Sequence, residues 1–147
     1  LGFVHDEASA FFGGLAGNAG LFSTARDVAR VYQMLLNGGE IDGQRYLSKE
    51  TCQLFTTETS KISRRGLGFD KPDADDPKKG NCAPAAPAEV YGHTGFTGTC
   101  AWVDPMNELV YVFLSNRIYP DVTNRKLNQL HIRERIQGAI YDAMKKK

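Results

Sequence analysis

Long hydrophobic runs are missing from this sequence, and so is an excess of charge of either sign. No apolar run approaches the roughly 18 residues that a membrane helix needs, and the N-terminus has no basic stretch followed by a signal-peptide core. Eighteen Lys and Arg against seventeen Asp and Glu leave a formal net charge of +1. Because no basic stripe with interleaved aromatics appears, we expect no nucleic-acid partner. Because no apolar run is long enough, we expect no membrane span.

Cysteine is also scarce. Cys52, Cys82 and Cys100 are an odd number at wide spacings without a Cys-x-x-Cys pair, so neither a disulfide framework nor a zinc site is indicated. The contiguous His, Asp and Glu of residues 5–7 rarely converge on one ion, because neighbours in sequence point apart. We therefore expect no metal and no cofactor.

What remains is the composition of an ordinary globular domain, with 41% hydrophobic and 24% charged residues in a chain of 147. Within residues 1–60 we expect a helical subregion. Thr24 can cap a helix of well-spaced apolar residues that ends at the Gly pair 38–39. A tight turn is predicted at residues 42–43, and Ser48 can cap a short helix through Phe55.

The second half of the chain is predicted to be a sheet with a terminal helix. Residues 70–89 hold four of the six prolines and no apolar period, which favours a long surface loop. Residues 91–104 and 108–115 are rich in β-branched and aromatic residues, and they are expected to form an antiparallel hairpin. From residue 124 onward, an amphipathic helix is expected to lie across the sheet, within a unit spanning residues 90–147.

The run His93-Thr94-Gly95-Phe96-Thr97-Gly98 is the strongest candidate for chemistry. It places an imidazole, a hydroxyl and a residue without a side chain on a predicted strand, and glycine lets a ligand approach the backbone closely. A strand edge that presents N–H groups to a carbonyl oxygen can stabilise an oxyanion. The pattern is equally compatible with an ordinary strand whose glycines provide twist or a bulge.

Three segments, taken together, resemble the C-terminal half of serine β-lactamase-like hydrolases, the superfamily of class C β-lactamases, DD-peptidases and related esterases. They are Gly-Asn-Ala-Gly-Leu-Phe-Ser-Thr at 17–24 with the helix after it, Tyr-Gly-His-Thr-Gly at 91–95, and Leu-Ser-Asn-Arg at 114–117. The chain is especially similar to the module that follows family 3 glycoside hydrolases labelled β-N-acetylglucosaminidase. The resemblance implies a partial α+β fold, an antiparallel sheet flanked by the C-terminal helix and a helical subregion.

The resemblance also implies roles for five residues. His93 would stand in place of the family's lysine as an electrostatic or proton-relay group, and Thr94 would bind a substrate carboxylate or carbonyl. Gly95 would keep the strand open, and the N–H of Phe96 would be one of two oxyanion donors. Arg117 would attract an anionic substrate.

Two elements of the family are absent from the sequence. No Ser-x-x-Lys, Tyr-x-Asn or Ser-x-Asn occurs, so the nucleophile and its base are missing. We therefore expect a catalytically incomplete chain whose partner is the N-terminal half of the module, located upstream of Leu1. The resemblance implies a small-molecule or cell-wall-type substrate, and a periplasmic or cell-surface location. The alternative is a noncatalytic module that binds a glycan or a protein partner.

The N-terminal stretch is unusually rich in large apolar residues. An apolar surface or open strand edge left without the rest of the module is normally covered by another chain, so we expect self-association. The residues expected at that contact are Phe3, Phe11, Phe12, Leu15 and Phe22.

Overall fold

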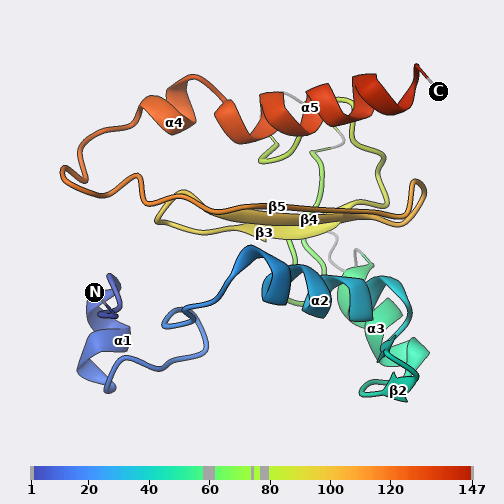
Figure 1. The fold of residues 1–147 in the computed structure, drawn as a ribbon, viewed down its shortest axis with the longest axis horizontal. Helices are drawn as coiled ribbons and strands as arrows, with labels where there is room; N and C mark the ends of the chain where they lie inside the picture. Colours follow the sequence, from blue (N-terminus) through green and yellow to red (C-terminus); the bar gives the residue numbers. More distant parts are fainter. Residues whose placement is uncertain (1, 58–61, 74, 77–79, 147) are drawn as a thin grey trace.

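A three-stranded antiparallel sheet, in the order β3-β4-β5, lies between two helical layers in the computed structural model of the chain (Figure 1). The structure describes residues 2–57, 62–73, 75–76 and 80–146. Helix α5 covers one face of the sheet, and α2 packs on the other face against β4 and β5. This is the expected α+β fold. Its elements are α1 (Glu7–Phe11), α2 (Ala25–Leu36), β1 (Glu40–Ile41), β2 (Gln44–Arg45), α3 (Lys49–Thr56), β3 (Tyr91–Thr94), β4 (Cys100–Asp104), β5 (Leu109–Phe113), α4 (Lys126–Gln129) and α5 (Ile132–Met144).

Helix α2 begins and ends where the sequence predicts. The Thr24 hydroxyl accepts a hydrogen bond from the backbone N–H of Asp27 at 3.2 Å and donates one to the carboxylate of the same residue at 2.8 Å. At the other end, the N–H of Gly39 donates to the carbonyl of Met34 at 2.8 Å. Gly39 has φ 94°, and a Cβ there would collide with the carbonyl oxygen of Leu47. The stop signal therefore requires glycine.

The predicted turn and second cap are also present. Asp42 and Gly43 have φ values of 53° and 75°, which join β1 to β2 in a two-residue hairpin. The Ser48 hydroxyl accepts from the N–H of Thr51 at 3.1 Å and caps α3. The described part of residues 1–60 thus holds the helices α1, α2 and α3 and the β1–β2 hairpin, and residues 58–60 lie outside it.

The prediction of one strand over residues 91–104 is wrong. The chain reverses between β3 and β4, where the N–H of Gly95 donates to the carbonyl of Thr99 at 2.8 Å and the N–H of Gly98 donates to the carbonyl of Gly95 at 3.0 Å. Gly98 has φ 99°, and a Cβ on it would collide with the Ser115 hydroxyl. The glycines therefore make a turn and not a bulge, and two successive hairpins form in place of one.

The main core lies between the sheet and α5. Residues 70–89 were expected to form a surface loop, but part of this segment is buried in that core. Cys82 and Ala83 are each 2% exposed. The N–H of Ala83 donates to the buried side-chain oxygen of Gln137 on α5, at 2.8 Å. Prolines and acidic residues dominate the composition of this segment, but its small apolar residues fit beneath the helix. The core cluster is Cys82, Val90, Cys100, Trp102 and Tyr111, with Ala86, Phe113 and Ile140 packed against it.

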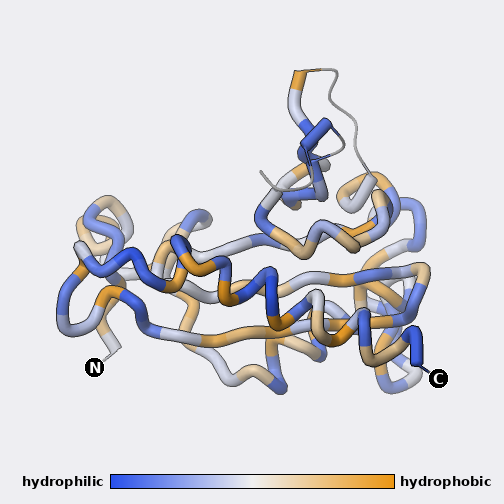
Figure 2. The backbone as a smooth tube through the Cα atoms, turned by 90° about the horizontal axis from the view of Figure 1, so that it is seen from above, coloured by the Kyte–Doolittle hydropathy of each residue, from blue (hydrophilic) through white to orange (hydrophobic). Residues whose placement is uncertain are grey.

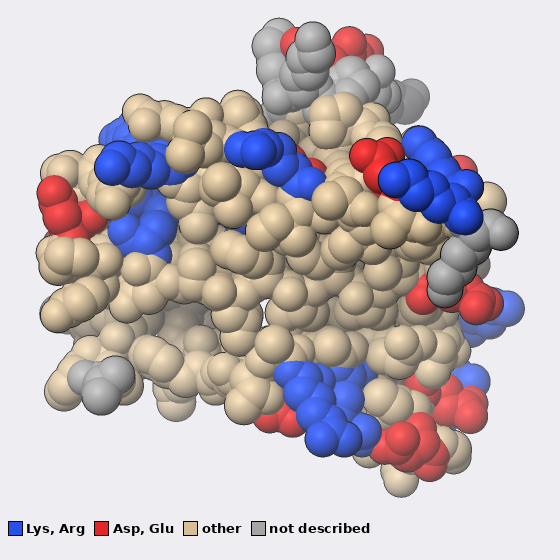
Figure 3. Space-filling model, turned by 45° about the horizontal axis from the view of Figure 1, so that its top comes forward, with Lys and Arg blue, Asp and Glu red and all other residues tan. Residues whose placement is uncertain are grey.

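The C-terminal helix is interrupted rather than continuous. His131 adopts the left-handed conformation with φ 49° and separates the short α4 from α5. Helix α5 lies across the sheet as expected, and hydrophilic and hydrophobic residues alternate along its turns (Figure 2). In the described ranges, no helix has the length and apolar character needed to cross a membrane. On the face shown in Figure 3, positive and negative side chains form separate small groups without a continuous basic surface.

Asp104 ties the β4–β5 turn to α5. Its carboxylate is 1% exposed and accepts from the N–H groups of Met106 and Asn107 at 2.9 and 3.1 Å. It also accepts from the amide of Asn107 at 2.7 Å and from the Tyr141 hydroxyl at 2.8 Å. One buried side chain therefore satisfies four donors at once.

We predict that Asp104→Ala lowers the free energy of unfolding by about 2–4 kcal/mol, because the buried Tyr141 hydroxyl is left without an acceptor, at about 1–3 kcal/mol, and the turn loses three further hydrogen bonds. Urea denaturation measures this. The matched control is Asp121→Ala, which removes an exposed carboxylate that accepts from the N–H and hydroxyl of Thr123. Equal losses in the two variants would contradict the importance assigned to burial.

Candidate functional site

The outer edge of β3 is open beyond one short contact. Gly92 exchanges backbone hydrogen bonds of 3.0 and 2.7 Å with Asp70 on the side of β3 away from β4. Backbone groups alternate in direction along a strand, so those of Thr94 point to the same side as those of Gly92. In the described part of the chain, the N–H of Phe96 donates to no acceptor. This unpaired donor lies in the turn that follows β3, two residues beyond the last strand residue, Thr94.

His93 is held between two partners that determine where its proton lies. Its Nδ1 is 2.7 Å from the carbonyl oxygen of Thr94, and its Nε2 is 3.0 Å from Nη1 of Arg65. A carbonyl oxygen only accepts and a guanidinium only donates. The imidazole in this geometry is therefore neutral, with its proton on Nδ1 and its Nε2 lone pair directed at Arg65.

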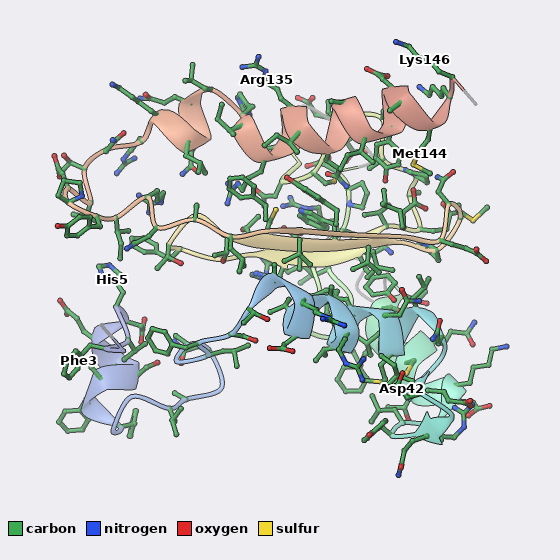
Figure 4. The ribbon with its side chains drawn as sticks, in the orientation of Figure 1. Phe3, His5, Asp42, Arg135, Met144 and Lys146 are labelled. Atoms are coloured by element: carbon green, nitrogen blue, oxygen red, sulfur yellow. The ribbon has the colours of Figure 1, made fainter. Side chains whose placement is uncertain are left out.

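Phe96 forms an aromatic platform at the start of the β3–β4 turn. Its side chain is 63% exposed. The ring of His5 stacks on it with centroids 5.1 Å apart and an interplanar angle of 11°. Figure 4 shows His5 directed from the N-terminal segment toward the end of the sheet, whereas Phe3 points away. No pattern in the sequence indicates this contact, because the two rings are 91 residues apart.

Arg117 holds the turn that carries Phe96. Its guanidinium carbon lies 4.6 Å from the centroid of the Phe96 ring, and its Nε donates to the Phe96 carbonyl at 2.8 Å. The backbone N–H of Arg117 donates to the carbonyl of Thr97 at 2.9 Å, and its Nη1 donates to that of Val122 at 3.3 Å. Its role as a substrate-binding group stays a prediction, and the contacts present give it a positioning role.

Gly95 is required by packing as well as by access to the strand. A Cβ at this position would collide with the hydroxyl of Thr99. The half-buried Thr94 precedes it and ends β3. The structure places His93, Thr94, Gly95, Phe96 and Arg117 together at one end of the sheet, and the chemical roles that the resemblance implies for them stay predictions.

A buried ion pair supports the segment that carries Arg65. The Asp70 carboxylate is 1% exposed and accepts from Nε of Arg64 at 2.9 Å, from the Asn81 amide at 2.8 Å and from the N–H of Lys71 at 3.0 Å. Burial acts to raise the pKa of Asp70, but the hydrogen bonds from Arg64 and Asn81 and the Arg64 charge outweigh it. They hold the pKa below its ordinary value of 3.8.

The ammonium group of Lys71 completes this support. Its Nζ donates to the carbonyl of Thr56 at the end of α3 at 3.2 Å, and to the carbonyls of Glu89 and Val90 before β3 at 3.3 Å each. Cations are stabilised at helix C-termini. The two neighbouring residues Asp70 and Lys71 thus join α3, β3 and the Arg65 segment.

The cysteines do not provide a nucleophile. Burial raises the pKa of the Cys82 thiol to about 12 and that of Cys100 to about 11, so both are protonated at neutral pH. Burial also raises the pKa of Cys52. All three thiols are free. In the described ranges, no three His, Cys, Asp or Glu side chains are arranged to hold a metal ion.

Comparison with known proteins identifies the family of the chain. The family model described as Beta-lactamase matches residues 2–134, so the chain belongs to the β-lactamase family. It therefore contains a β-lactamase-like serine hydrolase domain, in which the open β3 edge carries the His-Thr-Gly motif. The family match also supports a penicillin-binding-like domain.

Curated relatives carry a more specific name. A protein of Escherichia coli O157:H7 named "Putative D-alanyl-D-alanine carboxypeptidase" is 37% identical over 128 residues, which cover 86% of this chain and 29% of the relative. Proteins of the same name in Escherichia coli strain K12 and Salmonella agona strain SL483 are 36% identical with the same coverage. The chain spans less than a third of the length of these relatives.

The depressed pKa of Asp70 predicts an acid-sensitive fold. A carboxyl group with a folded-state pKa below its unfolded value contributes stability above the unfolded pKa, and that contribution is lost as pH falls through the folded pKa. We expect the free energy of unfolding to decrease below about pH 4, and Asp70→Asn to reduce this decrease. Urea titrations at several pH values, with the exposed Asp142→Asn as control, measure it. An unchanged pH dependence in Asp70→Asn would contradict the assignment.

Proposed function

We propose that this chain supplies the oxyanion and substrate-binding strand of a serine hydrolase that transfers the acyl group of a peptide ending in a free carboxylate. The observation that carries the proposal is the open edge of β3, where the unpaired N–H of Phe96 follows His93, Thr94 and Gly95. A fixed donor at such an edge stabilises the charge that develops on a carbonyl oxygen during attack. The name of the relatives supports a D-alanyl-D-alanine type of substrate.

The other parts of acyl transfer would come from outside this chain. A serine hydroxyl attacks the peptide carbonyl, a base takes its proton, and the oxyanion forms at the Phe96 N–H. Collapse then breaks the C–N bond, and the amine leaves with a proton. The sequence has no Ser-x-x-Lys, and its thiols are protonated. We therefore place the nucleophile and base in the remainder of the module and infer an extracytoplasmic location from the relatives. Fusion to a family 3 glycoside hydrolase stays a prediction.

The chain alone is expected to form no acyl-enzyme. Incubation with a fluorescent penicillin and with a serine-reactive phosphonate should leave its intact mass unchanged, because no activated hydroxyl is present. A catalytically complete DD-carboxypeptidase, labelled under the same conditions, is the positive control. Stoichiometric labelling of any Ser or Thr would overturn the division of parts proposed above.

The oxyanion role can be tested at the backbone itself, in a longer protein that joins this segment to a Ser-x-x-Lys. Phe96 is the second residue of the 95–98 turn, a position that accepts proline. Phe96→Pro removes the N–H and should reduce kcat about 10²–10³-fold, as loss of one oxyanion donor does. Phe96→Leu removes the ring but keeps the N–H and should retain most of the turnover. Equal turnover in both variants would favour the noncatalytic binding module.

We also propose that the remainder of the hydrolase module covers the N-terminal segment. Phe3, Phe11 and Leu15 are 90%, 86% and 79% exposed, and residues of this segment line a hollow of about 510 Å³. Exposed apolar patches of this density are normally covered. The aligned 128 residues are only 29% of the relative, which leaves ample sequence to cover the patch.

Without that cover, the chain should self-associate. We expect light scattering at low micromolar concentration to report a species larger than a monomer, and the double variant Phe3→Ser with Phe11→Ser to shift it toward the monomer. Leu130→Ser, which alters an exposed apolar residue at the end of α4, is the control. A stable wild-type monomer that binds no apolar dye would show that the segment needs no partner.

A further inference from the structure

Two neighbouring arginines have opposite surroundings. Arg64 is half-buried, with its guanidinium 2.9 Å from the Asp70 carboxylate and 3.6 Å from that of Asp73. Arg65 is exposed, and its guanidinium donates to Nε2 of His93 at 3.0 Å. Among the described residues, no Asp or Glu oxygen lies within 4.0 Å of Arg65. One charge is therefore neutralised by the fold, and the other is left at the open edge of β3.

We propose that Arg65 is the specificity-determining cation of this site, and that His93 is the neutral group that positions it. The inference rests on the proposed function, because it assigns the recognition of a substrate carboxylate to a particular side chain. Within this geometry His93 does not carry the positive charge, since its Nε2 accepts from Arg65 and its Nδ1–H is used by the Thr94 carbonyl.

The other cations near the site are engaged elsewhere. Arg117 donates to the carbonyls of Phe96 and Val122 and lies over the Phe96 ring. Arg64 is paired with Asp70, and Lys71 donates to three backbone carbonyls. A guanidinium has five donors in a planar fork and is always charged, so Arg65 can hold His93 and still bind a carboxylate with its remaining N–H groups.

The position of Arg65 is fixed from both sides. Its neighbour Arg64 is anchored to the buried Asp70, and Asp70 is itself paired with Gly92 of β3 through the backbone. The side chain of Arg65 itself reaches His93, the residue that follows Gly92 on β3. A cation held in this way loses little conformational entropy when it binds a ligand, because its segment is already ordered.

The first test is spectroscopic and needs no activity. In the chain labelled with ¹⁵N, the imidazole shifts of His93 at neutral pH should report the Nδ1–H tautomer with a hydrogen-bonded Nε2. Arg65→Gln should change the Nε2 shift, Arg65→Lys should retain part of the wild-type shift, and Arg135→Gln should leave it unaltered. Arg135 is an exposed arginine on α5 that points away from the sheet (Figure 4). An Nε2–H tautomer or an imidazolium in the wild-type chain overturns the proposed arrangement.

The second test measures recognition. Chemical-shift titration with N-acetyl-D-alanyl-D-alanine and with its C-terminal amide should show tighter binding of the carboxylate form. In the wild-type chain the Kd of the amide should exceed that of the carboxylate about tenfold or more, as expected for one charge-assisted contact. Arg65→Gln should remove this difference in Kd, and Arg135→Gln should keep it. Equal binding of the two peptides by the wild-type chain overturns the role of Arg65 but leaves the proposed function standing. Binding of neither peptide overturns the proposed function and the role of Arg65 with it.

Discussion

The buried carboxylate of Asp70 is the interaction on which the site depends. It is surrounded by donors from Arg64, Asn81 and the backbone of Lys71, so its charge is compensated without solvent. Loss of any one donor would leave a buried charge partly unpaired, which is far more costly than loss of a surface ion pair. The backbone of Asp70 also pairs with that of Gly92, and this bridge attaches the irregular segment before Asp70 to the edge of the sheet.

A second feature gives the open edge its rigidity. The turn between β3 and β4 is held from outside by Arg117, whose donors meet two carbonyls of the turn, and from the N-terminal side by His5 on the Phe96 ring. Catalytic donors are effective when they need no reorganisation at the moment of reaction. The residues that surround Phe96 restrict the turn that carries its N–H.

Sequence reasoning succeeded where the physical cause is local. The caps at Thr24 and Ser48 and the hairpin at Asp42 follow from side-chain chemistry within a few residues, and each is present. It failed where the cause is distant or competes with composition. The apolar character of residues 91–104 concealed a glycine turn, and prolines concealed the burial of Cys82.

The site itself was predicted in part. The motif located His93 to Phe96 because a family resemblance carries information about three-dimensional arrangement that periodicity lacks. His5 and Arg65 could not be found in this way, since each reaches the site through tertiary contacts from a segment without a distinctive pattern. A solvated arginine and one aimed at an imidazole look the same in sequence.

The number of residues between the Arg64–Arg65 pair and Asp70 determines which guanidinium faces the buried carboxylate, whatever the identity of those residues. Consecutive side chains leave the backbone in different directions, so a shift of one position would send the inner guanidinium outward and the outer one toward Asp70. An insertion or deletion between residues 65 and 70 would thus change which guanidinium meets Asp70 and which meets His93, without altering the identity of any existing side chain. Among proteins that share this arrangement, the spacing from the arginine pair to the aspartate should be constant even where the intervening residues differ.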